Sequence, residues 1–214
     1  MKDSRPQPFA YYLVLDFEGT CDENSRFDYA SEIIEFPVIL IDGQTLQIVD
    51  QFHRYVRPIL QPTLTEFCIS LTGITQEMVD KADPFDQVYN EFKTWLETYC
   101  PKPFNDCVFV TDGPWDLRDF FEKEITYYGM VRPDYMKSII NLRKQFQDYY
   151  KTSGNLNSML SFLKMEFQGR PHSGIDDATN LARIFLHMAN DGCRMDINTK
   201  LRKIKKSKWA QLRK

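Results

Sequence analysis

The chain has 214 residues, 43% of them hydrophobic and 14% aromatic, and a formal net charge of −3 at neutral pH. This length suits one domain with a sizeable core, and a second domain would have to be small. No apolar run approaches the roughly 18 residues of a membrane span, and residues 1–10 lack the apolar core of a secretory signal, so neither a membrane protein nor an exported one is indicated.

The five cysteines are scattered along the chain, and none belongs to a Cys-x-x-Cys pair. This pattern indicates neither a zinc ribbon nor a disulfide framework. We therefore expect free thiols in a reducing compartment, which would be the cytoplasm, the nucleus or both.

The charge is unevenly distributed. Residues 200–214 contain eight Lys and Arg residues and no acid, so the remainder of the chain is strongly acidic. A basic tail on an acidic body is typical of a protein that meets polyanions through the tail. A merely solvated end and a nuclear-import signal are the alternatives.

The first predicted element is a strand that leads into Asp16-Phe17-Glu18. Successive side chains of a strand alternate between its faces, so Asp16 and Glu18 point the same way, roughly 6–7 Å apart. Two carboxylates at the end of an apolar strand are costly to bury as anions unless a cation joins them. The alternative is a strand that simply runs out into a charged turn.

Residues 21–31 are polar and predict a loop. The β-branched segments 32–41 and 46–56 then flank Asp42-Gly43 and predict a β-hairpin. Pro37 implies an edge position or a bulge in the first arm. His53 lies in the second arm, and we interpret it as structural because no acidic pattern accompanies it.

Residues 57–75, rich in Pro and Thr, predict a connecting region. Asp83 and Pro84 suit the N-cap and first position of a helix. The buried face of that helix consists of Val88, Phe92, Trp95, Leu96 and Tyr99. Residues 107–111 predict an interior strand, and the helix that follows it places Asp116 in its first turn.

A further helix is predicted over residues 138–150. Apolar residues from Leu156 to Leu163 predict another, with its end at Gln168-Gly169. Ser173 is placed to cap a last helix, in which Asp177 lies about one turn from the start, where the helix dipole favours an anion. The order of elements predicts an α/β or α+β domain with a mixed sheet.

Five candidate residues fall at the ends of predicted elements, and such ends can converge on one edge of a sheet. They are Asp16, Glu18, Asp116, His172 and Asp177. Several carboxylates in one pocket would repel one another unless cations joined them. Oxygen ligands suit Mg²⁺ or Mn²⁺ rather than zinc. Two such ions are an apparatus for phosphodiester hydrolysis, and a neutral His172 could accept the proton of the attacking water.

The set Asp16-Phe17-Glu18, Asp116 and His172-x-x-x-x-Asp177 resembles the three exonuclease motifs of the DEDDh 3′–5′ exonucleases. More narrowly, six segments resemble the Eri (enhanced-RNAi) group, which includes the histone-mRNA 3′ exonuclease and Snipper-like nucleases. These segments are 13–21, 33–38, 52–58, 71–75, 111–116 and 169–177.

This resemblance covers roughly residues 10–195 and implies a ribonuclease-H-like exonuclease fold, with a mixed five-stranded sheet flanked by helices. We expect an N-terminal extension over 1–9, the exonuclease domain over 10–198 and a basic C-terminal tail over 199–214.

The resemblance also implies roles for single residues. Asp16, Glu18, Asp116 and Asp177 match the metal-binding acids, and His172 matches the general base. The 3′-terminal nucleotide would be held by the segments that contain Phe17, Gly19, Thr20, Leu71, Thr72 and Gly73. Asp112 is the alternative to Asp116. Asp176 is the rival of Asp177, but only Asp177 sits five residues after the histidine.

The expected function is that of a metal-dependent 3′–5′ exonuclease that removes nucleotides from RNA 3′ ends with two Mg²⁺ ions, for which Mn²⁺ can substitute. The expected role is processing or turnover of small, ribosomal or other structured RNAs, including RNA interference. The alternatives are an exonuclease for DNA or for duplexes with 3′ overhangs, and a catalytically silent module that binds RNA ends. The sequence indicates no membrane partner and no particular protein partner.

Overall fold

The computed structural model describes residues 6–23 and 31–202, and within them a single mixed β-sheet. Its strands are β1 (Tyr11–Leu15), β2 (Glu18–Gly19), β3 (Ile33–Asp42), β4 (Gln47–Tyr55), β5 (Cys107–Thr111), β6 (Ser138–Asn141) and β7 (Thr199–Lys200). β2 and β7 have two residues each, so five longer strands form the body of the sheet, as predicted. β1 lies between β3, to which it is antiparallel, and β5, to which it is parallel.

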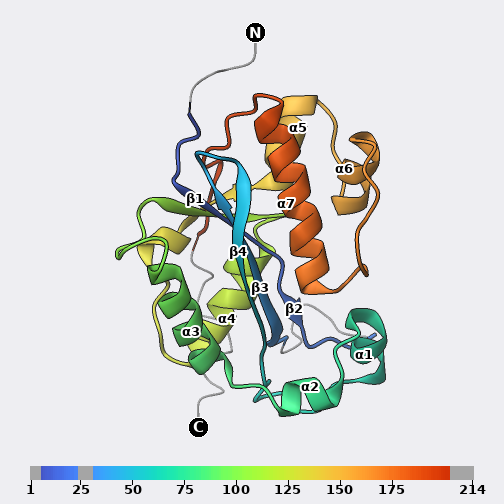
Figure 1. Ribbon diagram of the computed structural model, residues 1–214. Coiled ribbons are helices and arrows are strands. Elements are labelled where there is room, and N and C mark those ends of the chain that lie inside the picture. The colour runs from blue at the N-terminus through green and yellow to red at the C-terminus, as the bar shows by residue number, and fades with distance from the viewer. Residues whose placement is uncertain (1–5, 24–30, 203–214) are drawn as a thin grey trace.

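Helices cover both faces of this sheet (Figure 1). α3 (Phe85–Glu97), the π-helix η1 (Asp116–Phe120) and α4 (Phe121–Tyr127) contribute to one hydrophobic core, and the 3₁₀ turn η2 (Asp134–Met136) lies beside them. α5 (Leu142–Tyr150), α6 (Leu156–Phe162) and α7 (Gly174–Asn190) contribute to the other core. None of the helices in the described residues is long and apolar enough to span a membrane.

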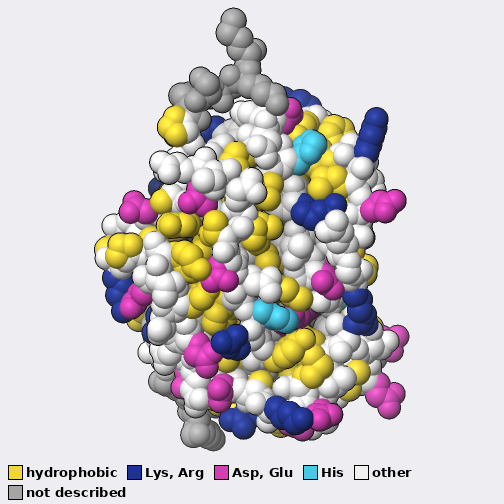
Figure 2. Space-filling model, in the orientation of Figure 1, with side chains coloured by type: hydrophobic (Ala, Val, Ile, Leu, Met, Phe, Trp, Pro, Cys, Tyr) yellow, Lys and Arg dark blue, Asp and Glu magenta, His cyan; other side chains and the backbone are white. Residues whose placement is uncertain are grey.

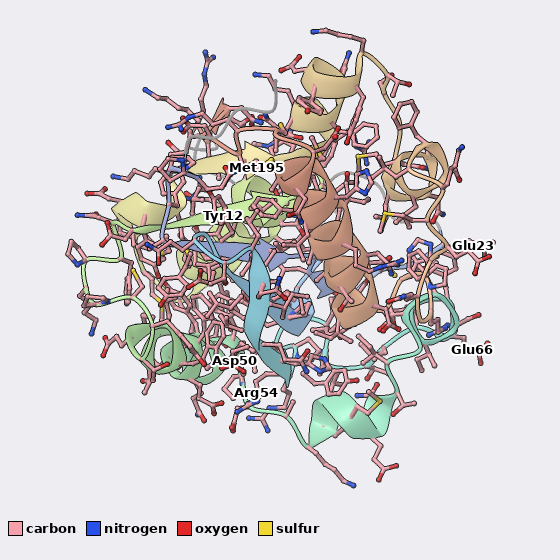
Figure 3. The ribbon with its side chains drawn as sticks, turned by 45° about the horizontal axis from the view of Figure 1, so that its top comes forward. Tyr12, Glu23, Asp50, Arg54, Glu66 and Met195 are labelled. Carbon is pink, nitrogen blue, oxygen red and sulfur yellow. The ribbon has the colours of Figure 1, made fainter. Side chains whose placement is uncertain are left out.

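The alternation of β1 assigns its side chains to these two cores. Leu13 and Leu15 belong to the α3 side, whereas Tyr12 and Val14 belong to the α7 side. The Tyr12 hydroxyl donates to the carbonyl of Met195, 3.2 Å away (Figure 3). This alternation determines which face the acids after β1 will occupy.

The predicted hairpin is formed by β3 and β4, which pair in antiparallel register. On its α3 side, the Asp50 carboxylate accepts hydrogen bonds from Trp95 and Tyr99, both at 2.7 Å, which ties β4 to α3 (Figure 3). Pro37 does not lie in an edge strand, because β3 is interior. The predicted bulge in this arm does occur, since Glu18 pairs with Glu35 and the next residue, Gly19, pairs with Ile33. Pro37 lies in a local gap, since β1 pairs as far as Val38 and β2 begins its pairing at Glu35.

Residues 57–75 hold more structure than the sequence predicted. They contain α1 (Glu66–Thr72), which is capped by the Thr65 side chain, and α2 (Gln76–Asp80) follows directly after them. These helices are only seven and five residues long, too short for a hydrophobic period to stand out. They enclose a third small core around Cys68.

Three helix boundaries also differ from the predictions. Residues 138–141 form β6 rather than helix, because Ile139 and Ile140 pair in parallel with β5, and Asn141 then caps α5. Pro84, not Asp83, is the N-cap of α3. α6 ends at Phe162, several residues before the predicted stop.

The chain segments at the two ends of the described residues pack on the domain. The Gln7 side chain donates to the Cys193 carbonyl and accepts from the Met195 N–H, and β7 pairs with β6. The five cysteines are free, as predicted. Three segments lie outside the described residues: 1–5, 24–30 and 203–214. The second is most of the loop predicted over 21–31, and the third contains most of the predicted basic tail.

Candidate active site

The acidic pair continues the alternation of β1. Asp16 and Glu18 lie on the side of the sheet that α7 covers, and Phe17 turns to the other side, where its ring packs edge-on against Phe36 at 4.8 Å. Glu18 lies in β2, whose pairing with β3 shifts register between Glu18 and Gly19. Asp16, Glu18 and Asp177 each place a carboxylate oxygen within 4.8 Å of the others.

Asp116 begins η1, five residues after β5 ends at Thr111, and is 7% exposed. Its Oδ1 accepts a hydrogen bond of 3.0 Å from the backbone N–H of Phe17, the residue between Asp16 and Glu18. The π-helical turn lets Asp116 face this strand while Leu117, next in the chain, is fully buried in the core. Asp116 therefore lies next to the cluster of Asp16, Glu18 and Asp177 but is not one of the three residues whose carboxylate oxygens lie within 4.8 Å of one another.

Asp112, the alternative to Asp116, is partnered by a cation. Its carboxylate pairs with the guanidinium of Arg143. That guanidinium also lies 5.6 Å from the ring centroid of Trp115, whose side chain is 47% exposed. The ring covers Gly113, where a Cβ atom would meet it at 1.8 Å. The Trp115 ring thus packs against Gly113 and lies near the Arg143 guanidinium.

The start of α7 brings in the last acid and the histidine. Asp177 is buried and its Oδ2 accepts the backbone N–H of His172 at 2.9 Å. Asp176 instead accepts the N–H of Arg170 at 2.9 Å, so the structure places Asp177 and not Asp176 with Asp16 and Glu18. Ser173 occupies the N-cap position as predicted, but its side chain makes no capping hydrogen bond.

His172 is exposed and has a left-handed backbone, with φ of 63°. It lines a pocket of about 200 Å³ together with Asp16 and Asp177. The other lining residues are Asp112, Asn155, Leu156, Asn157, Phe167 and Pro171. Sequence reasoning missed the wall contributed by α6, although Asn155 before a predicted helix is a recognisable N-cap signal.

Three of the six residues expected to hold a nucleotide are buried. The side chains of Phe17, Thr20 and Thr72 are buried, so a direct contact there would involve backbone atoms. Gly19 lies under the Phe120 ring, at 2.4 Å from where its Cβ would be.

Gly73 has φ of 76°, and the space beside it is filled by the Arg170 guanidinium. Arg170 also donates to the Ser70 carbonyl at 2.6 Å. The loop that carries His172 is therefore fastened to the end of α1, and Leu71 and Gly73 lie at that junction.

Burial is the main electrostatic feature of the acids. Desolvation, followed by repulsion from neighbouring carboxylates, raises the pKa of Glu18 to about 9 and holds the pKa of Asp16 well above its usual range. Desolvation also raises the pKa of Asp116 to about 7 and of Asp177 to about 6, against the opposing N–H donors of Phe17 and His172. A desolvated set of oxygen ligands that repel one another fits a hard divalent cation.

Comparison with known proteins gives a consistent result. A family model described as an exonuclease matches residues 13–185. The chain is 42% identical over 197 residues to 3′-5′ exoribonuclease 1 of Mus musculus, covering 90% of this chain and 57% of that protein. It is 35% identical to the 3′-5′ exonuclease eri1 of Schizosaccharomyces pombe, covering 93% of this chain and 74% of the yeast protein.

The fold is similar to that of a solved structure of the nuclease domain of 3′hExo, which is described as a DEDDh family member bound to rAMP. The TM-score is 0.86 at 40% identity, over 92% of this chain and 99% of the solved one. The chain spans little more than half the length of the mouse relative.

The raised pKa values predict how stability depends on pH without metal. Between about pH 4 and pH 9 the folded chain binds more protons at these acids than the unfolded chain does, so stability falls as pH rises through that window. We expect Asp16→Asn, which removes one repelling charge, to melt higher than wild type at pH 8 in chelator. A difference of about 1 kcal/mol corresponds to roughly 2–4 °C in a domain of this size.

Thermal melts at pH 5 and pH 8 would measure this effect. Asp148→Asn, which changes an exposed acid on α5, is the matched control and should follow wild type. Equal pH dependence in wild type and Asp16→Asn would contradict the interpretation.

Proposed function

The chain belongs to the exonuclease family, in its DEDDh branch and Eri group, and from this membership we propose that it is a metal-dependent 3′–5′ exoribonuclease. The observation that carries the proposal is the meeting of carboxylate oxygens of Asp16, Glu18 and Asp177 within 4.8 Å. Two of these residues, Asp16 and Asp177, line a pocket together with His172. Fold similarity alone would not assign an activity.

The proposed metal ligands are Asp16, Glu18 and Asp177, with Asp116 beside them. We propose Mg²⁺ as the physiological ion and Mn²⁺ as its substitute, because carboxylate oxygens are suitable ligands for both ions. When bound, divalent cations would supply the activation of water and the stabilisation of the leaving oxygen that phosphodiester hydrolysis requires.

The protein's own residues would position the substrate and move the proton. His172 lines the pocket beside Asp16, so its imidazole can accept the proton of the attacking water. The hydrogen bond from the His172 N–H to Asp177 ties the proposed base to a proposed metal ligand. A shift of either residue would therefore disturb the other.

RNA is the proposed substrate because the mouse relative is named as an exoribonuclease and the 3′hExo nuclease domain was solved with a ribonucleotide, rAMP. A free RNA 3′ end is the proposed partner, and processing or turnover of structured RNAs in the cytoplasm or nucleus is the proposed role. Figure 2 shows acidic and basic side chains interspersed on the face it displays, so no single-sign patch on that face suggests a separate polyanion site.

We expect the purified chain to shorten 5′-labelled RNA one nucleotide at a time, in Mg²⁺ or Mn²⁺ and not in chelator. Asp16→Ala and His172→Ala should each lower kcat by at least about a hundredfold, since each removes a ligand or a proton acceptor. Gel analysis of RNA and DNA oligonucleotides in parallel would measure the activity and the preference between them.

His187→Ala is the matched control for the histidine, because His187 is also exposed on α7 but lies near its far end. It should keep wild-type activity. Digestion that survives chelator, or equal digestion by wild type and Asp16→Ala, would refute the proposed function. Tight RNA binding without hydrolysis would instead support an RNA-end-binding module.

Trp115 offers a stacking surface for a base close to the site, because it is 47% exposed while its ring packs on Gly113 and near the Arg143 guanidinium. Stacking of one base on an aromatic ring contributes about 1–3 kcal/mol. We expect Trp115→Ala, in a His172→Ala background that leaves the RNA intact, to weaken binding of a short RNA by that amount. Trp115→Phe should retain most of the affinity in fluorescence-anisotropy titrations, and equal affinities for all three would exclude the stacking role.

The basic tail is proposed to bind phosphates along longer RNAs, although its residues from 203 onward lie outside the described part of the chain. Deleting 203–214 removes six cations and leaves β7 in place. We expect weaker binding of long single-stranded RNA and a shallower dependence of affinity on salt, by about 0.7 for each phosphate that the tail no longer neutralises. Turnover of short oligonucleotides should not change, and an unaltered salt slope would count against the tail.

A further inference from the structure

Glu35 is a further carboxylate close to the site, and the proposed ligand set does not use it. It lies in β3 and is only 1% exposed. Its Oε2 accepts the N–H of Gly174 at 2.8 Å, and its Oε1 accepts the N–H of Ile175 at 3.1 Å. These are the first two N–H groups of α7.

The Glu35 side chain therefore supplies the helix cap that Ser173 does not. A helix start leaves several N–H groups without partners inside the helix, and a carboxylate there gains from the helix dipole as well. Because Glu35 belongs to a different element, this cap also fixes where α7 begins relative to the sheet.

The junction between α7 and the sheet is tight. A Cβ atom on Gly174 would lie 2.7 Å from the backbone carbonyl of Asp16 and 3.0 Å from Glu35 Oε2. The first residue of α7 thus packs directly on the backbone of one proposed metal ligand. Three residues later, α7 carries Asp177, which in turn holds the N–H of His172.

His53 holds the carboxylate from the other side. Its Nε2 lies 2.8 Å from Glu35 Oε1, and its side chain is 26% exposed. The two residues are diagonal neighbours across the hairpin, because Pro37 pairs with His53 and Glu35 pairs with Tyr55. Both Glu35 oxygens are thus occupied by donors from α7 and β4.

We propose that Glu35 is a positioning residue of the active site, held by His53, which sets the start of α7 and thereby the placement of Asp177 and His172. It binds neither metal nor substrate in this role. The inference rests on the proposed exonuclease function for its kinetic consequence. Its structural consequence, the geometry of the metal ligands, can be measured without turnover.

The chain offers a matched control in Glu32, three residues earlier. Glu32 is also buried, at 5% exposed, and its carboxylate accepts the N–H groups of Ile59, Leu60 and Gln61. It ties the sheet to a loop, and its hydrogen bonds in the described part of the chain do not involve α7. Glu35→Gln and Glu32→Gln therefore each remove one buried carboxylate. Glu35 binds the start of α7, whereas Glu32 binds the loop at 59–61.

The experiment compares wild type, Glu35→Gln and Glu32→Gln in three measurements: melting temperature, Mn²⁺ binding followed by electron paramagnetic resonance, and kcat with KM on a short RNA. We expect both variants to melt lower than wild type. Only Glu35→Gln should bind Mn²⁺ more weakly, by about tenfold or more, and lose kcat by roughly tenfold to a hundredfold at similar KM.

Two substitutions of His53 refine the test. His53→Gln keeps a side-chain N–H donor and should stay within about threefold of wild type in kcat and Mn²⁺ affinity, whereas His53→Ala should move both in the direction of Glu35→Gln. Equal kcat and Mn²⁺ affinity in Glu35→Gln and Glu32→Gln would overturn the proposal and leave Glu35 with a role in stability alone. If wild type binds Mn²⁺ but digests no nucleic acid, the proposed function fails while the Mn²⁺ comparison still decides the role of Glu35, and a wild type that binds no Mn²⁺ would overturn both.

Discussion

The burial of several like-charged carboxylates against one another is the constraint on which the rest of this structure depends. Each loses hydration, and each raises the pKa of its neighbours. The chain partly offsets that cost with backbone donors, since Phe17 donates to Asp116 and His172 donates to Asp177. These bonds leave the remaining negative charge directed at one place, where a bound divalent cation would balance it.

The sheet makes this arrangement possible because β3 contacts both the strands next to Asp16 and Glu18 and the helix that carries Asp177. β3 pairs with β1, β2 and β4, and through Glu35 it also receives the start of α7. Core and site therefore share one strand. A substitution that destabilises the hairpin would therefore shift the carboxylates, even if the substituted residue lies outside the pocket.

Much of this organisation could be predicted from the sequence. The period-two alternation of β1 placed Asp16 and Glu18 on one face, and the apolar stripe of α7 placed Asp177 near its start, so the three acids were found from local patterns together with the family resemblance. Local patterns could not show that Ile139 and Ile140 extend the sheet, because that pairing depends on β5. The short helices α1 and α2 were missed for lack of length.

The contacts of the site that are hardest to predict from the sequence are those between residues far apart in the chain. Glu35 and Gly174 are 139 residues apart in the chain, and a single sequence contains no signal that joins them. His53 illustrates the same limit: it was interpreted as structural for want of an acidic partner, which lies across the hairpin at 2.8 Å. The register of that hairpin, which places Pro37 opposite His53 and Glu35 opposite Tyr55, is what brings the pair together.

The π-helical turn at Asp116–Phe120 has a consequence for how this protein can tolerate changes in length. Asp116 must face Phe17, while Phe121 and Ile125 must face the core. An α-helix advances by about 100° per residue, so a chain with one residue fewer in this turn would rotate either the acid or the buried face of α4 by roughly that angle. The extra residue of the π-helical turn reconciles the two requirements, so a single-residue deletion here would separate the position of Asp116 from the packing of α4 on the core.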